Sequence, residues 1–161
     1  MDKIETCKLS YIGEDMKLMI KSFADLTKDE LYEILRVRSE VFVIEQECFY
    51  QDMDGLDQVS VHVYYEDDEG NIQAYLRYYN KEDEPDTIQV GRVLTIERGT
   101  GLGAKLIDET MQHIRTMKTV KKVHLDALEY ASGYYEKEGF KVISEKFYND
   151  GQAHVEMEIL I

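Results

Sequence analysis

The stretch GRVLTIERGTGLGAKLIDE, residues 91–109, decides the fold because an alternating apolar run is followed in it by apolar residues at helical spacing. Four of the chain's ten glycines fall within it. The pattern predicts a strand over residues 87–96 and a helix that begins near Leu102. A glycine-rich turn between a strand and a helix lets backbone N–H groups converge on an anion at the positive end of the helix dipole. A phosphate group is the expected ligand of this turn.

The segments on either side of this stretch extend the same mixed pattern. Thr27 and Glu30 form a T-x-x-E capping box, which predicts the start of a helix that continues to about Glu45. A short helix is expected in ASGYYEKEGF, and the tripeptide NDG at residues 149–151 predicts a hairpin turn. Alternating runs predict strands over residues 17–23, 60–66, 72–79, 123–128, 142–148 and 153–160. The order β-α-β-β-β-α-β-α-β-β predicts an α/β (α+β) fold, a mixed sheet with helices on its faces.

Length and charge narrow the class of protein. A chain of 161 residues with 43% apolar residues suits one domain, and residues 1–15 are poorly patterned, so we expect an N-terminal arm before a single domain over residues 16–161. The formal charge of −14 argues against nucleic acid and membrane surfaces as partners. No apolar stretch approaches the roughly 20 residues that cross a bilayer. We expect a cytoplasmic protein.

Metal ligands are not indicated. Cys7 and Cys48 are far apart in sequence, and His62, His113 and His124 lack the spacing of a ligand set. The acidic segment QDMDGLDQ resembles a calcium loop, but its glycine is misplaced for an EF-hand. Asp52, Asp54 and Asp57 either attract a cationic substrate or end the preceding helix, and we favour the second interpretation.

Three interpretations of the glycine turn compete. A Walker A loop is excluded because no Lys-Ser or Lys-Thr pair follows the glycines. Gly99, Gly101 and Ala104 fit a dinucleotide fingerprint with Asp126 as the ribose-binding acid, but only 35 residues follow Asp126 and they include a hairpin. A turn that binds no ligand is the third possibility.

Two motifs point to a family. Arg98, Gly101 and Gly103 form R-x-x-G-x-G, and ASGYYEKEGF fits A-x-x-x-Y-x-x-x-G-F. Together they resemble the GNAT N-acetyltransferase superfamily. LRVRSEVFVIEQECFYQDMDGLD at residues 35–57, GRV at residues 91–93 and DGQAHVEM at residues 150–157 resemble its ElaA-like group. One departure is that the connection from Arg92 to Arg98 is shorter than usual for that group.

The resemblance implies a GNAT-like, largely antiparallel central sheet with helices on both faces and a splayed strand pair. It also implies acetyl-CoA as cofactor. Val93 and Thr95 would pair with the pantetheine arm through their backbone. Arg98 would add positive charge beside the diphosphate. The diphosphate would lie against the main-chain N–H groups of Gly99, Thr100, Gly101, Leu102 and Gly103.

The same resemblance makes Tyr135 the acid that protonates the departing thiolate. Glu45 and His154 are the candidates for removing a proton from the acceptor, which we expect to be a primary amine on a small molecule or an amino terminus. A homodimer that pairs through the late strands is plausible. Two other functions stay open at this point: a non-catalytic acyl-CoA sensor and an NAD-type dinucleotide-binding protein.

Overall fold

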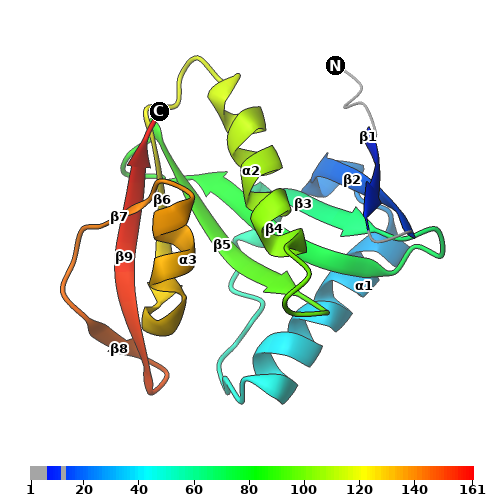
Figure 1. Cartoon of the computed structure of the whole chain (residues 1–161), viewed down its shortest axis with the longest axis horizontal. Helices are drawn as coiled ribbons and strands as arrows, with labels where there is room; N and C mark the ends of the chain where they lie inside the picture. Colours follow the sequence, from blue (N-terminus) through cyan, green and yellow to red (C-terminus); the bar gives the residue numbers. More distant parts are fainter. Residues whose placement is uncertain (1–6, 12–13) are drawn as a thin grey trace. The chain divides into compact units, whose positions relative to one another are not determined.

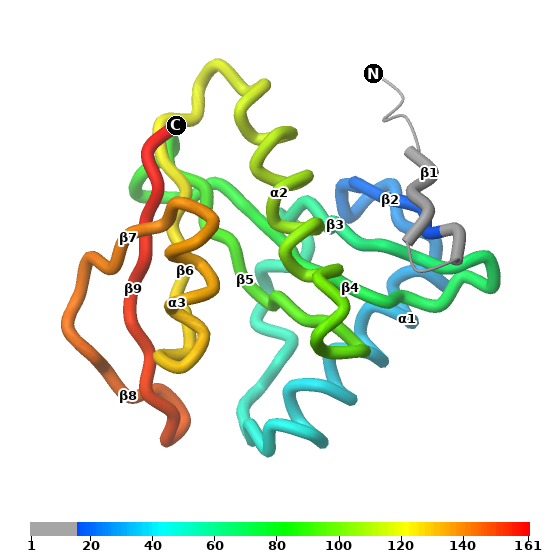
Figure 2. Tube along the Cα trace, viewed as in Figure 1, coloured from blue at the N-terminus to red at the C-terminus, as the bar shows by residue number. Residues whose placement is uncertain are grey.

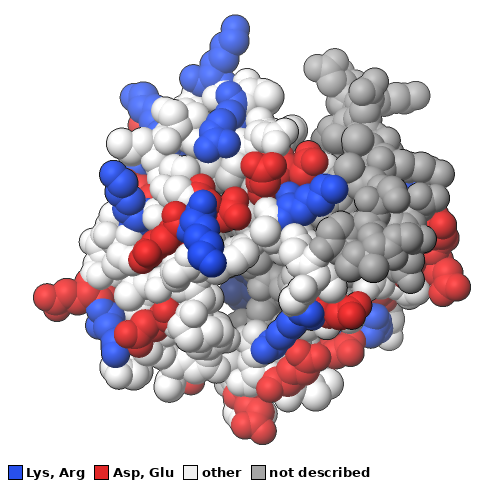
Figure 3. Space-filling model, viewed as in Figure 1, with Lys and Arg blue, Asp and Glu red and all other residues white. Residues whose placement is uncertain are grey.

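The computed structural model describes the backbone of residues 7–11 and 14–161 and the side chains from residue 16 onward. By compactness the chain divides into two units that are interleaved in the sequence. Unit 1 contains the residues up to Arg77 together with Arg92–Leu106, and unit 2 contains Tyr78–Gly91 and Ile107–Ile161. Figure 1 labels the helices and strands of both. On the face in Figure 3, acidic and basic side chains are interspersed.

The strands form a mixed, mostly antiparallel sheet, as the sequence predicted. Their hydrogen-bonded order is β1-β2-β3-β4-β5-β6-β9-β7, with β8 on β9. Strands β5 and β6 pair in parallel, and the pairs β1–β2, β2–β3, β6–β9, β7–β9 and β8–β9 are antiparallel. The strands are β1 (Cys7–Tyr11), β2 (Glu14–Ser22), β3 (Val61–Glu66), β4 (Ile72–Asn80), β5 (Thr87–Thr95), β6 (Lys122–Leu128), β7 (Lys141–Val142), β8 (Phe147–Asn149) and β9 (Gln152–Leu160).

The first helical region of unit 1 begins as the sequence predicted. Helix α1 (Lys28–Arg38) follows a capping box in which the Thr27 side chain accepts from the Glu30 N–H and the Glu30 carboxylate accepts from the Thr27 N–H. The helix then changes to a π-helix, η2 (Ser39–Glu45), which the apolar periodicity did not distinguish from α-helix. Its buried residues Val41 and Phe42 join a core with Ile34, Val37, Tyr64, Ile72, Tyr75 and Leu94.

Short 3-10 turns complete the helical elements: η1 (Phe23–Asp25), η3 (Asp57–Val59) and η4 (Glu129–Ala131). Helix α2 (Leu102–Arg115) has the predicted apolar stripe, with Leu106, Ile107, Met111 and Ile114 buried. In unit 2, α3 (Ser132–Lys137) lies beside β6 and β9. Among the described residues, none of the helices combines the length and apolar composition needed to cross a bilayer.

Two segments differ from the sequence prediction. The strand expected over residues 142–148 is two short strands, β7 and β8, because residues between them leave the ladder. There the Ser144 hydroxyl accepts from the Glu156 N–H at 2.9 Å, in place of a backbone carbonyl. Strand β1 lies within the residues 1–15 for which an N-terminal arm was expected, and it pairs with β2. The NDG turn is confirmed, with positive φ at Asp150 (50°) and Gly151 (76°).

The splayed strand pair is also confirmed. The parallel ladder joins Thr87–Val90 of β5 to Lys122–Leu125 of β6 and ends there, while β6 continues its pairing with β9 as far as Leu128. Two residues later, Arg92 has a φ of 55°, a left-handed conformation that is uncommon for a residue with a side chain. The course of β5 into the following turn and α2 can be traced in Figure 2.

Candidate active site

The glycine turn follows β5 directly and opens helix α2. Gly99 and Gly101 have φ values of 77° and 76°, which side chains disfavour. The Thr100 hydroxyl accepts from the Leu102 N–H at 3.3 Å, and the Gly101 carbonyl accepts from the Lys105 N–H at 3.1 Å. The first N–H groups of a helix have no intrahelical acceptor, so this end of α2 offers donors to an anion.

The predicted cofactor-binding residues all lie in unit 1. Leu94 and Leu102 are buried and anchor the two ends of the turn in the apolar interior. Val93 and Thr95 flank Leu94 and are half-buried, as strand alternation requires. A Cβ at Gly99 would meet nothing within 4 Å, so space is open beside this backbone. The turn therefore fits a diphosphate in conformation, in free space and in its position at a helix N-terminus.

Glu45, a candidate general base, lies close to the predicted cation of the turn. It ends the π-helix η2, and its carboxylate is 3.9 Å from the Arg98 guanidinium. The Arg98 side chain is 70% exposed, so this ion pair is weak and Arg98 is available to a ligand.

Tyr135 and His154, the other predicted catalytic residues, belong to unit 2. Tyr135 is buried on α3, where its ring packs edge-on against Tyr134 at 5.1 Å and Phe140 at 6.1 Å. Burial raises the pKa of Tyr135 to about 12, so the phenol keeps its proton at neutral pH, as a general acid must.

His154 lies on β9 close to the hairpin turn. Its Nδ1 is 2.9 Å from the Gln152 carbonyl oxygen and therefore donates to it, and its ring stacks on Phe147 at 5.7 Å. With Nδ1 protonated, Nε2 of the neutral ring is the basic atom. This geometry serves either a proton acceptor or an ordinary histidine at the rim of the sheet.

Three arginines and three aspartates of unit 1 form a network that we call the Arg–Asp cluster: Arg38, Arg77, Arg92, Asp52, Asp54 and Asp57. Arg38 is fully buried and donates to Asp52 at 2.9 Å and to Asp57 at 2.6 Å. Arg77 donates to Asp54 and, at 2.7 Å, to Asp57. A buried charge is tolerated only when it is paired, and here each guanidinium has a carboxylate.

The cluster fixes the residue at which β5 changes direction. The Arg92 guanidinium donates to the Asp52 carboxylate at 2.8 Å and to the Asp52 carbonyl at 3.0 Å, and it lies 5.3 Å from the centre of the Tyr50 ring. Arg92 is the residue with a φ of 55° that precedes Val93 and Thr95. Side-chain contacts to the loop after η2 thus hold the backbone of the proposed pantetheine-binding segment.

The acidity of the aspartates follows from these partners. Burial alone would raise the pKa of Asp54, but hydrogen bonds from Arg77 and from the Leu56 N–H outweigh it and lower the pKa to about 2. Burial likewise opposes ionisation of Asp57, and hydrogen bonds from Arg38 and Arg77 leave its pKa below the ordinary value. Both carboxylates are ionised at neutral pH and bound to arginines.

His62 supports the same loop from β3. It is fully buried, with Nε2 3.0 Å from the Asp57 carbonyl oxygen and Nδ1 2.8 Å from the Tyr75 hydroxyl. Burial lowers the pKa of His62, so the neutral ring donates to the carbonyl and accepts from the phenol. The histidine thus has a satisfied structural place.

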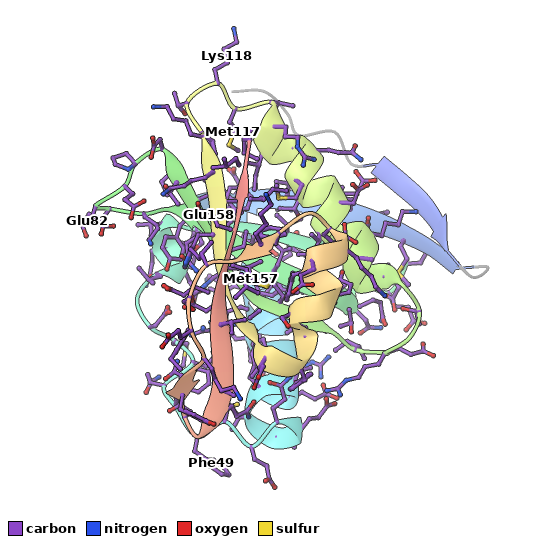
Figure 4. All side chains as sticks on the ribbon, turned by 60° about the vertical axis from the view of Figure 1, so that its left-hand side comes forward. Phe49, Glu82, Met117, Lys118, Met157 and Glu158 are labelled. Atoms are coloured by element: carbon purple, nitrogen blue, oxygen red, sulfur yellow. The ribbon has the colours of Figure 1, made fainter. Side chains whose placement is uncertain are left out.

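The two interpretations of the acidic segment both need correction. Asp52, Asp54 and Asp57 are held by Arg38, Arg77 and Arg92, so they are neither a free acidic surface nor simply the end of a helix. Phe49, just before this segment, is 84% exposed and projects outward in Figure 4. Arg77 was not predicted from the sequence, because a single arginine in an apolar strand belongs to no motif. The available signal was the position of a charged residue at the centre of a strand that was expected to be buried.

Comparisons with known proteins agree with this geometry. The family model for the acetyltransferase (GNAT) domain matches residues 23–161. The chain is 32% identical over 137 residues to protein ElaA of Escherichia coli, with 83% of this chain and 90% of that protein covered. A UPF0039 protein of Schizosaccharomyces pombe is 34% identical over 151 residues, covering 90% of this chain and 97% of the relative.

Solved structures show the same fold. An acyl-CoA N-acyltransferase from Pseudomonas aeruginosa superposes with a TM-score of 0.82 at 35% identity, covering 89% of this chain and 98% of that chain. The crystal structure of E. coli ElaA gives a TM-score of 0.82 at 28% identity with the same coverage. The fold and the turn after β5 define a protein of the acyl-CoA-dependent acyltransferase class. The chain belongs to the GNAT acetyltransferase family.

Proposed function

We propose that the protein is an acetyl-CoA-dependent N-acetyltransferase that acts on a primary amine by direct attack. The observation that carries the proposal is the sequence of features along β5 and α2. Pairing of β5 with β6 ends at Val90, the backbone turns at Arg92, and two left-handed glycines then open helix α2. Beyond Val90 the β6-side edge of β5 is no longer paired with β6, so an extended ligand with an anionic end can pair along it and reach the start of α2.

In the proposed complex the pantetheine arm pairs with the backbone at Val93 and Thr95. N–H groups among residues 99–103, other than that of Leu102, which donates to the Thr100 hydroxyl, donate to the diphosphate, and Arg98 adds an exposed positive charge. A backbone N–H of β5 donates to the oxyanion that forms when the amine attacks the thioester carbonyl. Donors fixed in the fold stabilise that charge without reorganisation.

Three proton transfers accompany the reaction. The acceptor ammonium loses a proton to Glu45 or His154, directly or through water, because only the neutral amine is nucleophilic. The tetrahedral intermediate then collapses, the carbon–sulfur bond breaks, and the thiolate takes the phenolic proton of Tyr135. The nitrogen of the new amide gives up its extra proton, which returns through water to the phenolate. Burial raises the pKa of Tyr135 to about 12, so the phenol is protonated at neutral pH.

Thiol release tests the proposal. Acetyl-CoA is mixed with the protein and polyamines, amino sugars, amino acids or peptide N-termini, and free CoA is measured with a thiol reagent. At least one amine class should release CoA above the rate without amine. Binding of CoA without release by any amine would favour the sensor, and binding of NAD without CoA would favour a dinucleotide-binding protein. A panel of acyl-CoA chain lengths separates acetyl from longer acyl donors.

Tyr135→Phe tests the acid, with Tyr134→Phe as the matched control. The Tyr134 hydroxyl is buried and, among the described residues, has no hydrogen-bond partner, so its loss removes no interaction. Tyr135→Phe should lower kcat about 100-fold with unchanged CoA affinity, the range typical of general acids. Equal turnover by the two variants would contradict the assignment. Sedimentation of the same preparations tests the proposed homodimer.

A further inference from the structure

Three side chains on one face of β6 and β9 form a group that acetyl transfer does not use. His124 and Asp126 are two residues apart on β6, and Glu156 is the register partner of Asp126 on β9. One ligand atom from each lies within 4.8 Å of the other two. His124 Nε2 is 3.5 Å from a Glu156 oxygen and 4.0 Å from an Asp126 oxygen.

Gln89 fixes the histidine ring in the orientation that a metal ligand needs. His124 is 6% exposed, and its Nδ1 is 2.6 Å from Gln89 Oε1, an acceptor, so Nδ1 donates. The amide is oriented by its own Nε2, which donates to the Val90 carbonyl at 3.4 Å. In the neutral ring the lone pair of His124 Nε2 therefore faces two carboxylates. An outer hydrogen bond of this kind is what orients metal-bound histidines.

The charges of the Asp126 and Glu156 carboxylates are not neutralised by a lysine or arginine among the described residues. In the described part of the chain, neither Asp126 nor Glu156 forms an ion pair with a lysine or arginine. The nearby Lys122 is paired with Glu84 at 3.1 Å and Glu158 at 3.6 Å. Both carboxylate side chains are about half exposed, 50% and 45%, so an ion reaches them from solvent.

We propose that His124, Asp126 and Glu156 bind a divalent transition-metal cation of the Zn²⁺ type. Ligand atoms about 2.0–2.1 Å from a tetrahedral zinc lie about 3.3–3.4 Å apart, so the observed separations close with small side-chain rotations. One nitrogen and two carboxylate oxygens leave a fourth position for water. The site lies within unit 2 and does not depend on the proposed acetyl transfer.

Isothermal titration of the metal-free protein with Zn²⁺ at neutral pH tests the site. The wild type should bind one Zn²⁺, and His124→Ala and Asp126→Asn should each weaken binding at least about tenfold, since loss even of an outer partner of a metal ligand costs about 10- to 100-fold. His124 is buried, so His124→Ala could unfold the protein. Asp126 is half exposed, so Asp126→Asn keeps the fold and still tests the site. Glu158→Gln, on the same strand and labelled in Figure 4, is the matched control and should bind normally.

Cobalt supplies a second measurement on the wild type. Co²⁺ should bind with the visible absorption of a four-coordinate ion, and Zn²⁺ should displace it. Absence of stoichiometric Zn²⁺ uptake would overturn the proposal and leave a histidine beside two carboxylates with no metal role. Equal weakening by Glu158→Gln would also overturn it, because binding would then reflect only diffuse acidic charge.

Discussion

The two ends of residues 92–103 are built in opposite ways. At Arg92 the conformation is held by side chains, since the Arg–Asp cluster matches every buried guanidinium with a carboxylate. At Gly99 and Gly101 it is allowed by the absence of side chains, and the first N–H groups of a helix have no intrahelical acceptor. The difference separates the roles: a cluster whose charges are satisfied internally supports the fold, and a turn with donors to spare binds a ligand.

The largest effect should come from breaking the cluster. Asp57→Ala leaves Arg38 and Arg77 buried with one carboxylate fewer, and loss of one partner from a buried ion pair costs about 3–5 kcal/mol. Urea unfolding measures the change. Asp68→Ala, at an exposed turn position, is the control and should change stability by less than about 0.5 kcal/mol. Similar losses for the two variants would mean that the cluster does not stabilise the fold.

Acid should reduce the contribution of the Arg–Asp cluster to the free energy of unfolding. The pKa of Asp54 is lowered to about 2 and that of Asp57 is lowered too, against about 3.9 in an unfolded chain. Their stabilisation is therefore complete above about pH 4 and is lost as the pH falls through about 2. Urea midpoints measured across this range should fall, with a shallower slope for Asp54→Asn. An unchanged slope would show that Asp54 is not held by Arg77.

A substitution in the glycine turn should lower the affinity for CoA as well as the stability of the fold. Gly99 and Gly70 have φ values of 77° and 81°, and a Cβ at either position meets nothing within 4 Å. Alanine at each should therefore cost a similar amount of stability, about 1–2 kcal/mol. Only Gly99→Ala should also weaken CoA binding, by about tenfold, since it alters the diphosphate donors. Equal CoA affinity for the two variants would remove the turn from the binding site.

The smallest effect is expected at Arg98. Its side chain is 70% exposed, so Arg98→Ala should weaken CoA binding only about threefold, the range of an exposed ion pair. The difference from wild type should shrink as salt is raised from 50 to 500 mM, about the range over which screening becomes complete. A loss that salt does not reduce would indicate a buried contact in the complex.

The glycine turn could be predicted from the sequence, but the Arg–Asp cluster could not. The junction at residues 91–109 gave the strand, the turn and the helix, because periodicity and glycine spacing are local properties. The motif from Arg38 to Asp57 was visible, but its physical meaning was not. Its acids meet arginines 14 to 40 residues away, and pairing over such separations leaves no periodic signal.

Other features were missed for similar reasons. The π-helix after Arg38 has the same apolar repeat as an α-helix, so composition did not reveal it. His124 had no ligand spacing along the chain, since its third partner, Glu156, lies on a different strand and becomes a neighbour only through the β6–β9 register. Local pattern predicts elements, and the partners of charged residues depend on tertiary pairing.

Titration calorimetry with CoA and with pantetheine tests the central claim most directly, because the two ligands share the thiol arm and CoA adds the diphosphate with the phosphoadenosine attached to it. Two or more charge-assisted hydrogen bonds from the turn are worth about 3 kcal/mol or more, so CoA should bind at least about 100-fold more tightly than pantetheine. Equal affinities, or no heat with CoA, would contradict the account that the amides after β5 bind the diphosphate.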